Sequence, residues 1–243
     1  MKTTILMTAC INPCNMVNTA VKNIDTRKRE YIEALKYYLQ QTKFDIVFVE
    51  NSGTDISSFF IPEIKDDRLE MITYTGNHFS TDLGKGFGEG EILRYAFTNS
   101  RKLLQESKIY KISGRHIVKN ISTIDKLSDL LRLPKHFILC DFNPKYQSAI
   151  SDLFLATRDF YTDFLLPLTF KIDESQGIWF EHILYKAIRS YSKKGLPCFL
   201  PCSISQIGHS GSTGMKLEKG TAKGHIRNFI KALLYRCHYW KVR

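Results

Sequence analysis

The sequence predicts an α/β fold, in which one open sheet carries helices on both faces. Apolar, β-branched runs of strand length alternate along the chain with segments of helical periodicity. The first of these segments follow one another as strand, helix and strand, at the spacing of a βαβ unit. With 243 residues, 43% apolar and 24% charged, the chain can bury the core of one domain.

The first half of the chain gives the clearest alternation. The run 45–49 is apolar after its first residue, Asp45, as is typical of a buried strand, and Ile32, Leu35 and Leu39 recur on one face of a helix. Ile92 and Phe97 mark a second helix in the same way. We expect strands at 4–9, 45–49, 69–74 and 109–112, and helices at 27–40 and 89–104.

The second half is more mixed and ends in a basic segment. Short strands are expected at 136–140 and 153–156, and a helix at 178–191. A loop rich in glycine and serine follows at 208–214. Without internal repeats or a low-complexity linker, the sequence predicts a catalytic domain over 1–220 and a helical appendage over 221–243.

Several features point to a reduced, cytoplasmic protein. No stretch approaches the roughly 18 consecutive apolar residues of a membrane-spanning helix. The apolar part of the N-terminus is about three residues long, too short for an export signal, so we interpret it as a strand. The six cysteines form no CxxC pair, which favours free thiols in a reducing compartment.

The excess positive charge is confined to the end of the chain. The net charge is +11, yet from His182 onward twelve Lys and Arg residues face one acid, Glu218, while the preceding part is neutral. Within 222–243, apolar residues recur at helical spacing with basic residues beside them: Ile226, Phe229, Ile230, Leu233, Leu234 and Cys237. Such a helix is typical of binding to an anionic membrane surface. The alternative is a helix packed on the domain with a solvated basic face.

Polar residues follow three of the predicted strands. In open α/β sheets, ligands bind beyond the carboxyl ends of the strands. The residues there are Cys10 to Pro13, Glu50 to Ser52, and Ser113 to Arg115. They can hold a nucleoside, a ribose or a phosphate, or they can be ordinary turn formers.

Two glycine-rich loops are candidate phosphate sites. The cluster from Gly84 to Gly90 leads into a helix, whose free N–H groups favour an anion. It matches neither the Walker A loop nor the Rossmann fingerprint. The loop 208–216 carries His209, Ser212, Thr213 and Lys216, and can close over a diphosphate or serve as a solvated connector.

Acidic residues cluster at the start of the helix predicted over 178–191. Asp173, Glu174 and Glu181 stand there together, and carboxylates are the usual general bases. Glu181 lies beside the apolar face, so it can point into a cleft. The alternative is an exposed acid favoured by the helix dipole.

Taken together, these motifs resemble a bacterial glycosyltransferase of the GT-A type, of the kind encoded in capsule and lipopolysaccharide O-antigen loci. The resembling stretches keep the same order over most of the chain, at 8–13, 46–52, 84–89, 111–115 and 207–214. The resemblance implies a GT-A-like (Rossmann-like) mixed sheet flanked by helices. It also implies transfer of a sugar from a nucleotide-sugar donor to a hydroxyl of a growing surface glycan on a lipid carrier, by an enzyme peripheral to the inner face of the cytoplasmic membrane.

The resemblance also implies roles for the candidate residues. Ala9, Asn12, Glu50 and Asn51 would hold the nucleoside of the donor, with Lys85 and Gly86 near its ribose and phosphates. Glu181 would be the first choice of catalytic base, followed by Asp173 and Glu174.

One departure concerns the metal. The position of the usual Asp-x-Asp metal site reads Ser113-Gly114-Arg115, without a carboxylate. A divalent ion (Mn²⁺ or Mg²⁺) therefore stays an open alternative, and Arg115, Lys85, His209 and Lys216 are the candidates to neutralise the diphosphate.

Two other classes of function remain open at this stage. A nucleic-acid-binding α/β protein would suit the net charge and the 12% aromatic content. The charge is confined to one end, however, and the aromatic pattern of an RNA-binding motif is missing, so no nucleic-acid partner is expected. A catalytically inactive, membrane-associated adaptor is the third reading, because the Asp-x-Asp motif is absent.

Overall fold

A seven-stranded mixed sheet forms the centre of the computed structural model, which describes residues 2–14, 16, 19–105, 107–209, 215 and 221–242. The strand order is β10-β6-β9-β4-β1-β2-β3. All neighbours pair in parallel except β9, which runs antiparallel to both β4 and β6. The seven strands are β1 (Lys2–Ala9), β2 (Asp45–Glu50), β3 (Leu69–Thr73), β4 (Ser107–Ser113), β6 (Phe137–Leu139), β9 (Leu153–Thr157) and β10 (Leu196–Cys198).

Two short antiparallel strand pairs and seven α-helices complete the secondary structure of the described part of the chain. The pairs are β5 (Ile117–Val118) with β11 (Gln206–Ile207), and β7 (Phe142–Asn143) with β8 (Ser148–Ala149). The helices are α1 (Ile24–Gln41), α2 (Ile61–Lys65), α3 (Gly84–Asn99), α4 (Ile121–Leu130), α5 (Leu166–Thr169), α6 (Phe180–Tyr191) and α7 (Ala222–Val242). Single 3₁₀ or π turns lie between them at η1 (Ser57–Phe59), η2 (Thr81–Leu83), η3 (Lys102–Leu104), η4 (Phe160–Leu165) and η5 (Glu174–Gln176).

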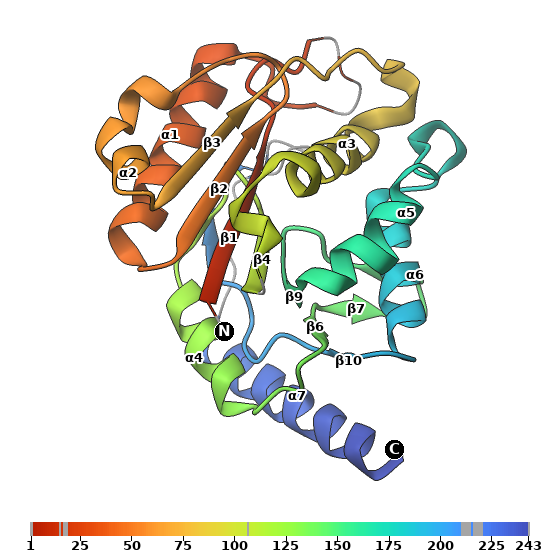
Figure 1. Ribbon diagram of the computed structural model, residues 1–243. Helices are drawn as coiled ribbons and strands as arrows, with labels where there is room; N and C mark the ends of the chain where they lie inside the picture. Colours follow the sequence, from red (N-terminus) through yellow and green to blue (C-terminus); the bar gives the residue numbers. More distant parts are fainter. Residues whose placement is uncertain are drawn as a thin grey trace.

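The helices cover both faces of the sheet, so the predicted α/β architecture is confirmed. In β2, Ile46 and Phe48 point to one core, while Val47 and Val49 point to the other, as the two-residue period of a strand dictates. Helices α1, α4 and α7 cover the first face. Helices α3 and α6, with the π turn η4, cover the second. Figure 1 shows α3 at the top of the view, α5 and α6 to its right and below it, and α7 beside β10 at the bottom of the molecule.

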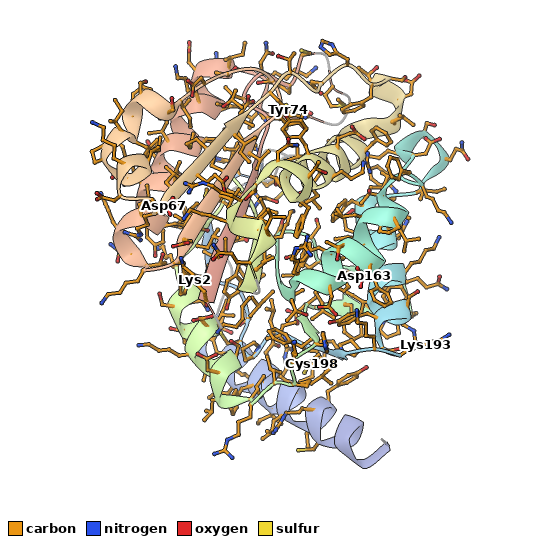
Figure 2. All side chains as sticks on the ribbon, viewed as in Figure 1. Lys2, Asp67, Tyr74, Asp163, Lys193 and Cys198 are labelled. Atoms are coloured by element: carbon orange, nitrogen blue, oxygen red, sulfur yellow. The ribbon has the colours of Figure 1, made fainter. Side chains whose placement is uncertain are left out.

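The predicted C-terminal helix is present, and it packs on the domain through another face than its apolar row. Ala232 and Asn228 are buried against the domain, and the Cys198 thiol donates a hydrogen bond to the Ala232 carbonyl at 3.3 Å. Cys198 lies on β10 beside this helix (Figure 2). The row Ile226, Ile230, Leu233 and Leu234 remains exposed. Helix α7 therefore packs on the domain and still presents apolar side chains outward.

No helix in the described part of the chain has both the length and the apolar character needed to cross a bilayer. The six cysteines are all free thiols.

The hydroxyl of Tyr38 fastens α1 to the turn that leads from β4 to β5. It is fully buried, donates to the His116 carbonyl at 2.8 Å and accepts from the Val118 N–H at 2.8 Å. Tyr38→Phe leaves the Val118 N–H buried without a partner. We expect the free energy of unfolding, measured by chemical denaturation, to fall by about 1–3 kcal/mol. Tyr37→Phe, whose hydroxyl bond to Lys119 lies at the surface, is the control, and an equal loss in both variants would contradict this role.

Candidate functional site

A pocket of about 270 Å³ opens beyond the carboxyl ends of β1 and β4. Thr8, Ala9 and Ser113 form its strand side, and the start of α3 and the start of α6 face them. Ligands of open α/β sheets bind at this edge, because the carboxyl ends of the parallel strands bring polar groups and loops together there.

Seven predicted site residues line this pocket: Ala9, Asn51, Lys85, Gly86, Arg115, Glu174 and Glu181. Four described ones, Asn12, Glu50, Asp173 and His209, are not among its lining residues. The predicted residues Ser212, Thr213 and Lys216 lie outside the described residues. Segments far apart in the sequence thus meet at one site.

Glu50 holds the two loops that form one wall of the pocket. Its carboxylate is completely buried and accepts the N–H groups of Ile11 at 2.8 Å, Ser52 at 3.0 Å and Thr54 at 2.9 Å. The Ser52 hydroxyl also donates to it, and in turn accepts the N–H of Asn12 at 2.9 Å. Glu50 and Asn12 therefore shape the loops from within.

The turn after β1 is fixed by α1. The Arg27 guanidinium donates to the Cys10 carbonyl at 2.9 Å, and the Tyr31 hydroxyl accepts the Cys10 N–H at 3.0 Å. Burial raises the pKa of the Cys10 thiol to about 12, so this cysteine is no activated nucleophile. Gly114 donates its N–H to the Thr8 carbonyl at 3.0 Å, and a Cβ there would lie 2.6 Å from that oxygen. The close approach of β1 to the end of β4 requires glycine.

The N-terminus of α3 already holds an anion supplied by the protein. The helix begins at Gly84, five residues before the predicted start, where φ is +80°. Glu174 accepts the buried N–H of Gly86 at 2.7 Å, and a Cβ on Gly84 would lie 2.2 Å from this carboxylate. The glycine cluster therefore admits Glu174 beside the helix end, where its charge meets the positive end of the dipole.

A buried ion pair lies next to the pocket, which its acidic member, Glu89, lines. Lys111 on β4 is fully buried, pairs with Glu89 on α3 and donates to the Ser151 carbonyl at 2.8 Å. The Ser151 hydroxyl donates to Glu181 at 2.7 Å, so the α6 carboxylate is held in a set orientation. Glu181 lines the pocket beside them, as a general base requires.

Arg115 and His209 share one acidic partner. The Arg115 guanidinium lies 2.5 Å from Glu30 on α1, and His209 Nδ1 lies 3.1 Å from the other oxygen of the same carboxylate. Arg115 lines the pocket, and Lys85 lines it from the start of α3. Positive charge thus borders the same space as the Glu181 carboxylate.

The Asp173 carboxylate accepts hydrogen bonds from the turn that follows it in the sequence. It accepts the Ser175 N–H at 3.1 Å and the Ser175 hydroxyl at 2.6 Å at the start of η5, and these bonds hold the pKa of its carboxyl below the usual range. It caps the turn that presents Glu174.

Sequence reasoning missed several residues of the pocket, among them His116, Ser151 and Asp152. Ser151 and Asp152 precede the strand β9, whereas the sequence pattern of ligand-binding loops points to residues that follow a strand. Because β9 is antiparallel, its first residues lie at the edge where the parallel strands end, and the Ser113 N–H donates to the Asp152 carbonyl at 3.2 Å. An antiparallel assignment for 153–157 would have pointed to them.

The donor set beyond β4 does not fit a divalent metal. Ser113, Gly114 and Arg115 offer a hydroxyl and a guanidinium there, whereas Mg²⁺ and Mn²⁺ prefer carboxylate oxygens. Over the described ranges, no group of three or more His, Cys, Asp or Glu side chains is arranged to hold a metal ion.

No protein-family model and no curated protein matches the sequence. Among solved structures, the chain is similar to a Desulfovibrio desulfuricans protein described as a nucleotide-diphospho-sugar transferase, at 10% identity and a TM-score of 0.42, over 82% of this chain and 81% of that one. It is similar to the inositol-1-phosphate CTP transferase of T. maritima, at 11% identity and a TM-score of 0.45, over 96% of both chains. It is also similar to S. aureus TarS in complex with UDP, at 10% identity and a TM-score of 0.44, over 98% of this chain and 65% of that one.

Replacing Glu50 tests whether it acts as a framework residue. Glu50→Gln puts an amide N–H₂ opposite backbone N–H donors that now share a carboxylate. We expect the free energy of unfolding, measured by denaturant titration, to fall by about 2 kcal/mol or more. Asp55→Asn, at an exposed turn beyond the same strand, is the control. Unchanged stability in Glu50→Gln would contradict the assignment.

Proposed function

We propose that the chain is a glycosyltransferase that moves a sugar from a nucleotide-sugar donor to a hydroxyl of a growing surface glycan, O-antigen or capsule, on a lipid carrier. The observation that carries the proposal is the pocket itself, where Arg115 and Lys85 border the same space as the Glu181 carboxylate. Sugar transfer from a nucleoside diphosphate needs this combination: positive charge for the departing diphosphate and a base for the attacking hydroxyl.

On this proposal the donor binds at the carboxyl ends of β1 and β2. Ala9 and Asn51 contact the nucleoside, on loops that Glu50 and Arg27 hold in place. Because these loops are fixed before the ligand arrives, little ordering is needed on binding. Arg115 and Lys85 border the diphosphate, with Gly86, whose N–H is held by Glu174, lining the pocket beside Lys85. His209, Ser212, Thr213 and Lys216 are proposed to complete the surroundings of the diphosphate.

Glu181 is the proposed catalytic base. The acceptor hydroxyl attacks the anomeric carbon and gives its proton to Glu181, a new carbon–oxygen bond forms, and the bond from the anomeric carbon to the diphosphate breaks. The hydrogen bond from Ser151 leaves the Glu181 carboxylate oriented toward the pocket. Arg115 and Lys85 stabilise the charge that develops on the leaving nucleoside diphosphate.

Helix α7 is the proposed contact with an anionic membrane surface. Its outward row is Ile226, Ile230, Leu233 and Leu234, flanked by the exposed Lys223, Arg227 and Lys231, and the helix contains no acid. A bilayer with anionic headgroups offers both an apolar layer and negative charge to such a face. Attachment there would bring the enzyme to an acceptor on a lipid carrier, at the inner face of the cytoplasmic membrane.

Glu181→Gln is expected to lower sugar transfer and leave donor binding intact. Loss of a general base lowers turnover by about 10²- to 10⁴-fold, while the neutral side chain keeps the shape of the site. The released nucleotide, a nucleoside diphosphate or, from a CMP-sugar, CMP, reports turnover. The rise in melting temperature with UDP-, GDP-, CMP- and dTDP-sugars, with Mn²⁺ or with EDTA, reports binding.

Glu33→Gln, an exposed acid on α1, is the matched control. Full turnover in Glu181→Gln would remove Glu181 from this role. No change in melting temperature of the wild-type protein with any donor would contradict the proposed function.

The membrane proposal is tested by placing an acid in the outward row. Leu234→Asp and Ile230→Asp each remove apolar area and add negative charge, so sedimentation with phosphatidylglycerol vesicles is expected to fall about tenfold or more. Leu104→Asp, at an exposed leucine on η3 and not on α7, controls for the substitution itself. The proposal would be contradicted if the two α7 variants bound the vesicles as well as the Leu104→Asp control does. It would also be contradicted if the wild-type protein bound neutral phosphatidylcholine vesicles as well as phosphatidylglycerol vesicles.

A further inference from the structure

The His116 side chain is buried beside the pocket, and one of its two ring nitrogens makes no hydrogen bond to the described part of the chain. It is 6% exposed and lines the pocket just beyond β4. Its Nε2 lies 3.2 Å from the His209 carbonyl oxygen. Its Nδ1 has no hydrogen-bond partner within the described part of the chain and lies 3.7 Å from Asp152 Oδ1.

The chemistry of these neighbours fixes which nitrogen carries the proton. A carbonyl oxygen only accepts, so the Nε2 that faces His209 is the donor. Burial lowers the pKa of His116, with Arg115 and Lys111 acting in the same direction and Asp152 and the His209 carbonyl opposing it. The imidazole is therefore neutral near pH 7, and Nδ1 presents a lone pair.

Asp152 presents a second acceptor beside it. Gln206 on β11 donates to Asp152 Oδ2 at 3.3 Å, which leaves Oδ1 toward His116. Pairing of β11 with β5 and of β9 with β4 places the two groups together. The Nδ1 lone pair and the carboxylate oxygen are both hydrogen-bond acceptors, so they cannot bond to each other. Each needs a hydrogen-bond donor from another molecule.

We propose that His116 Nδ1 and Asp152 Oδ1 form a subsite for a vicinal diol of a sugar ring bound in the pocket. Two hydroxyls on adjacent ring carbons carry one donor hydrogen each, one for each acceptor. A cationic amine is disfavoured, because the positive charges of Arg115 and Lys111 already act on His116. This inference rests on the proposed function, and the diol belongs either to the ribose of the nucleotide or to the transferred sugar.

The test compares ligands with and without the diol. Affinities of UDP, CDP, GDP and ADP are measured by calorimetry near neutral pH against their 2′-deoxy forms, which probes the ribose. The sugar is probed with the best-binding nucleotide-sugar against the same donor carrying a 2-deoxy sugar. In one of these pairs we expect the diol form to bind about tenfold more tightly, as befits one well-placed hydrogen bond.

Asp152→Asn is the decisive variant, because its amide can donate to His116 Nδ1 and satisfy the nitrogen internally. We expect it to weaken the diol ligand about tenfold, leave the deoxy ligand unchanged and bring their ratio to about one. His116→Phe, which removes the other acceptor, is expected to do the same. Asp163→Asn is the matched control, since this half-exposed side chain pairs with Lys194 on the outer helical layer (Figure 2) and should keep the wild-type ratio.

The outcomes separate the two proposals. If wild-type protein binds nucleotide-sugars without preferring a diol in either pair, or if the preference survives both variants, the subsite is refuted and the proposed function stands. If no nucleotide or nucleotide-sugar binds at all, the proposed function fails and the subsite fails with it.

Discussion

The ammonium group of Lys111 is the point on which the pocket depends. It is fully buried in β4, and a buried charge is tolerated only where partners surround it. Glu89 of α3 and the Ser151 carbonyl supply those partners, and Ser151 then holds Glu181 of α6. One charge in the sheet thus fixes the relative positions of two helices and of the strand that begins beside them.

The loops of the pocket follow the same principle, since polar side chains of the protein satisfy them from within. Glu50 gathers the N–H groups of two loops, and Arg27 holds the turn after β1. Glu174 occupies the end of α3 in the same way. Among the charged and polar side chains that line the pocket are the cations Arg115 and Lys85, the carboxylate of Glu181, and the acceptor pair of His116 and Asp152.

The α/β architecture could be predicted because its strands and helices have strong periodicity and the parallel strands are buried on both faces. The pocket could be placed because strand ends point to one edge. The roles of Glu50 and Glu174 could not, because a sequence does not tell whether a carboxylate faces a ligand or the backbone of its own loops. Asp152 was missed because the direction of β9 is decided by its neighbours in the sheet. Periodicity predicted helix α7 but did not decide which of its faces meets the domain: Asn228 and Ala232 are buried there, whereas Ile230 and Leu234 are exposed.

The central claim is that this pocket receives a nucleotide-sugar. A crystal structure of the chain with its best-binding nucleoside diphosphate tests it most directly. The account predicts ligand density beyond the ends of β1 and β4, with the diphosphate between Arg115 and Lys85 and the nucleoside beside Ala9 and Asn51. Density at another place, such as the basic residues of α7, with an empty pocket would contradict it.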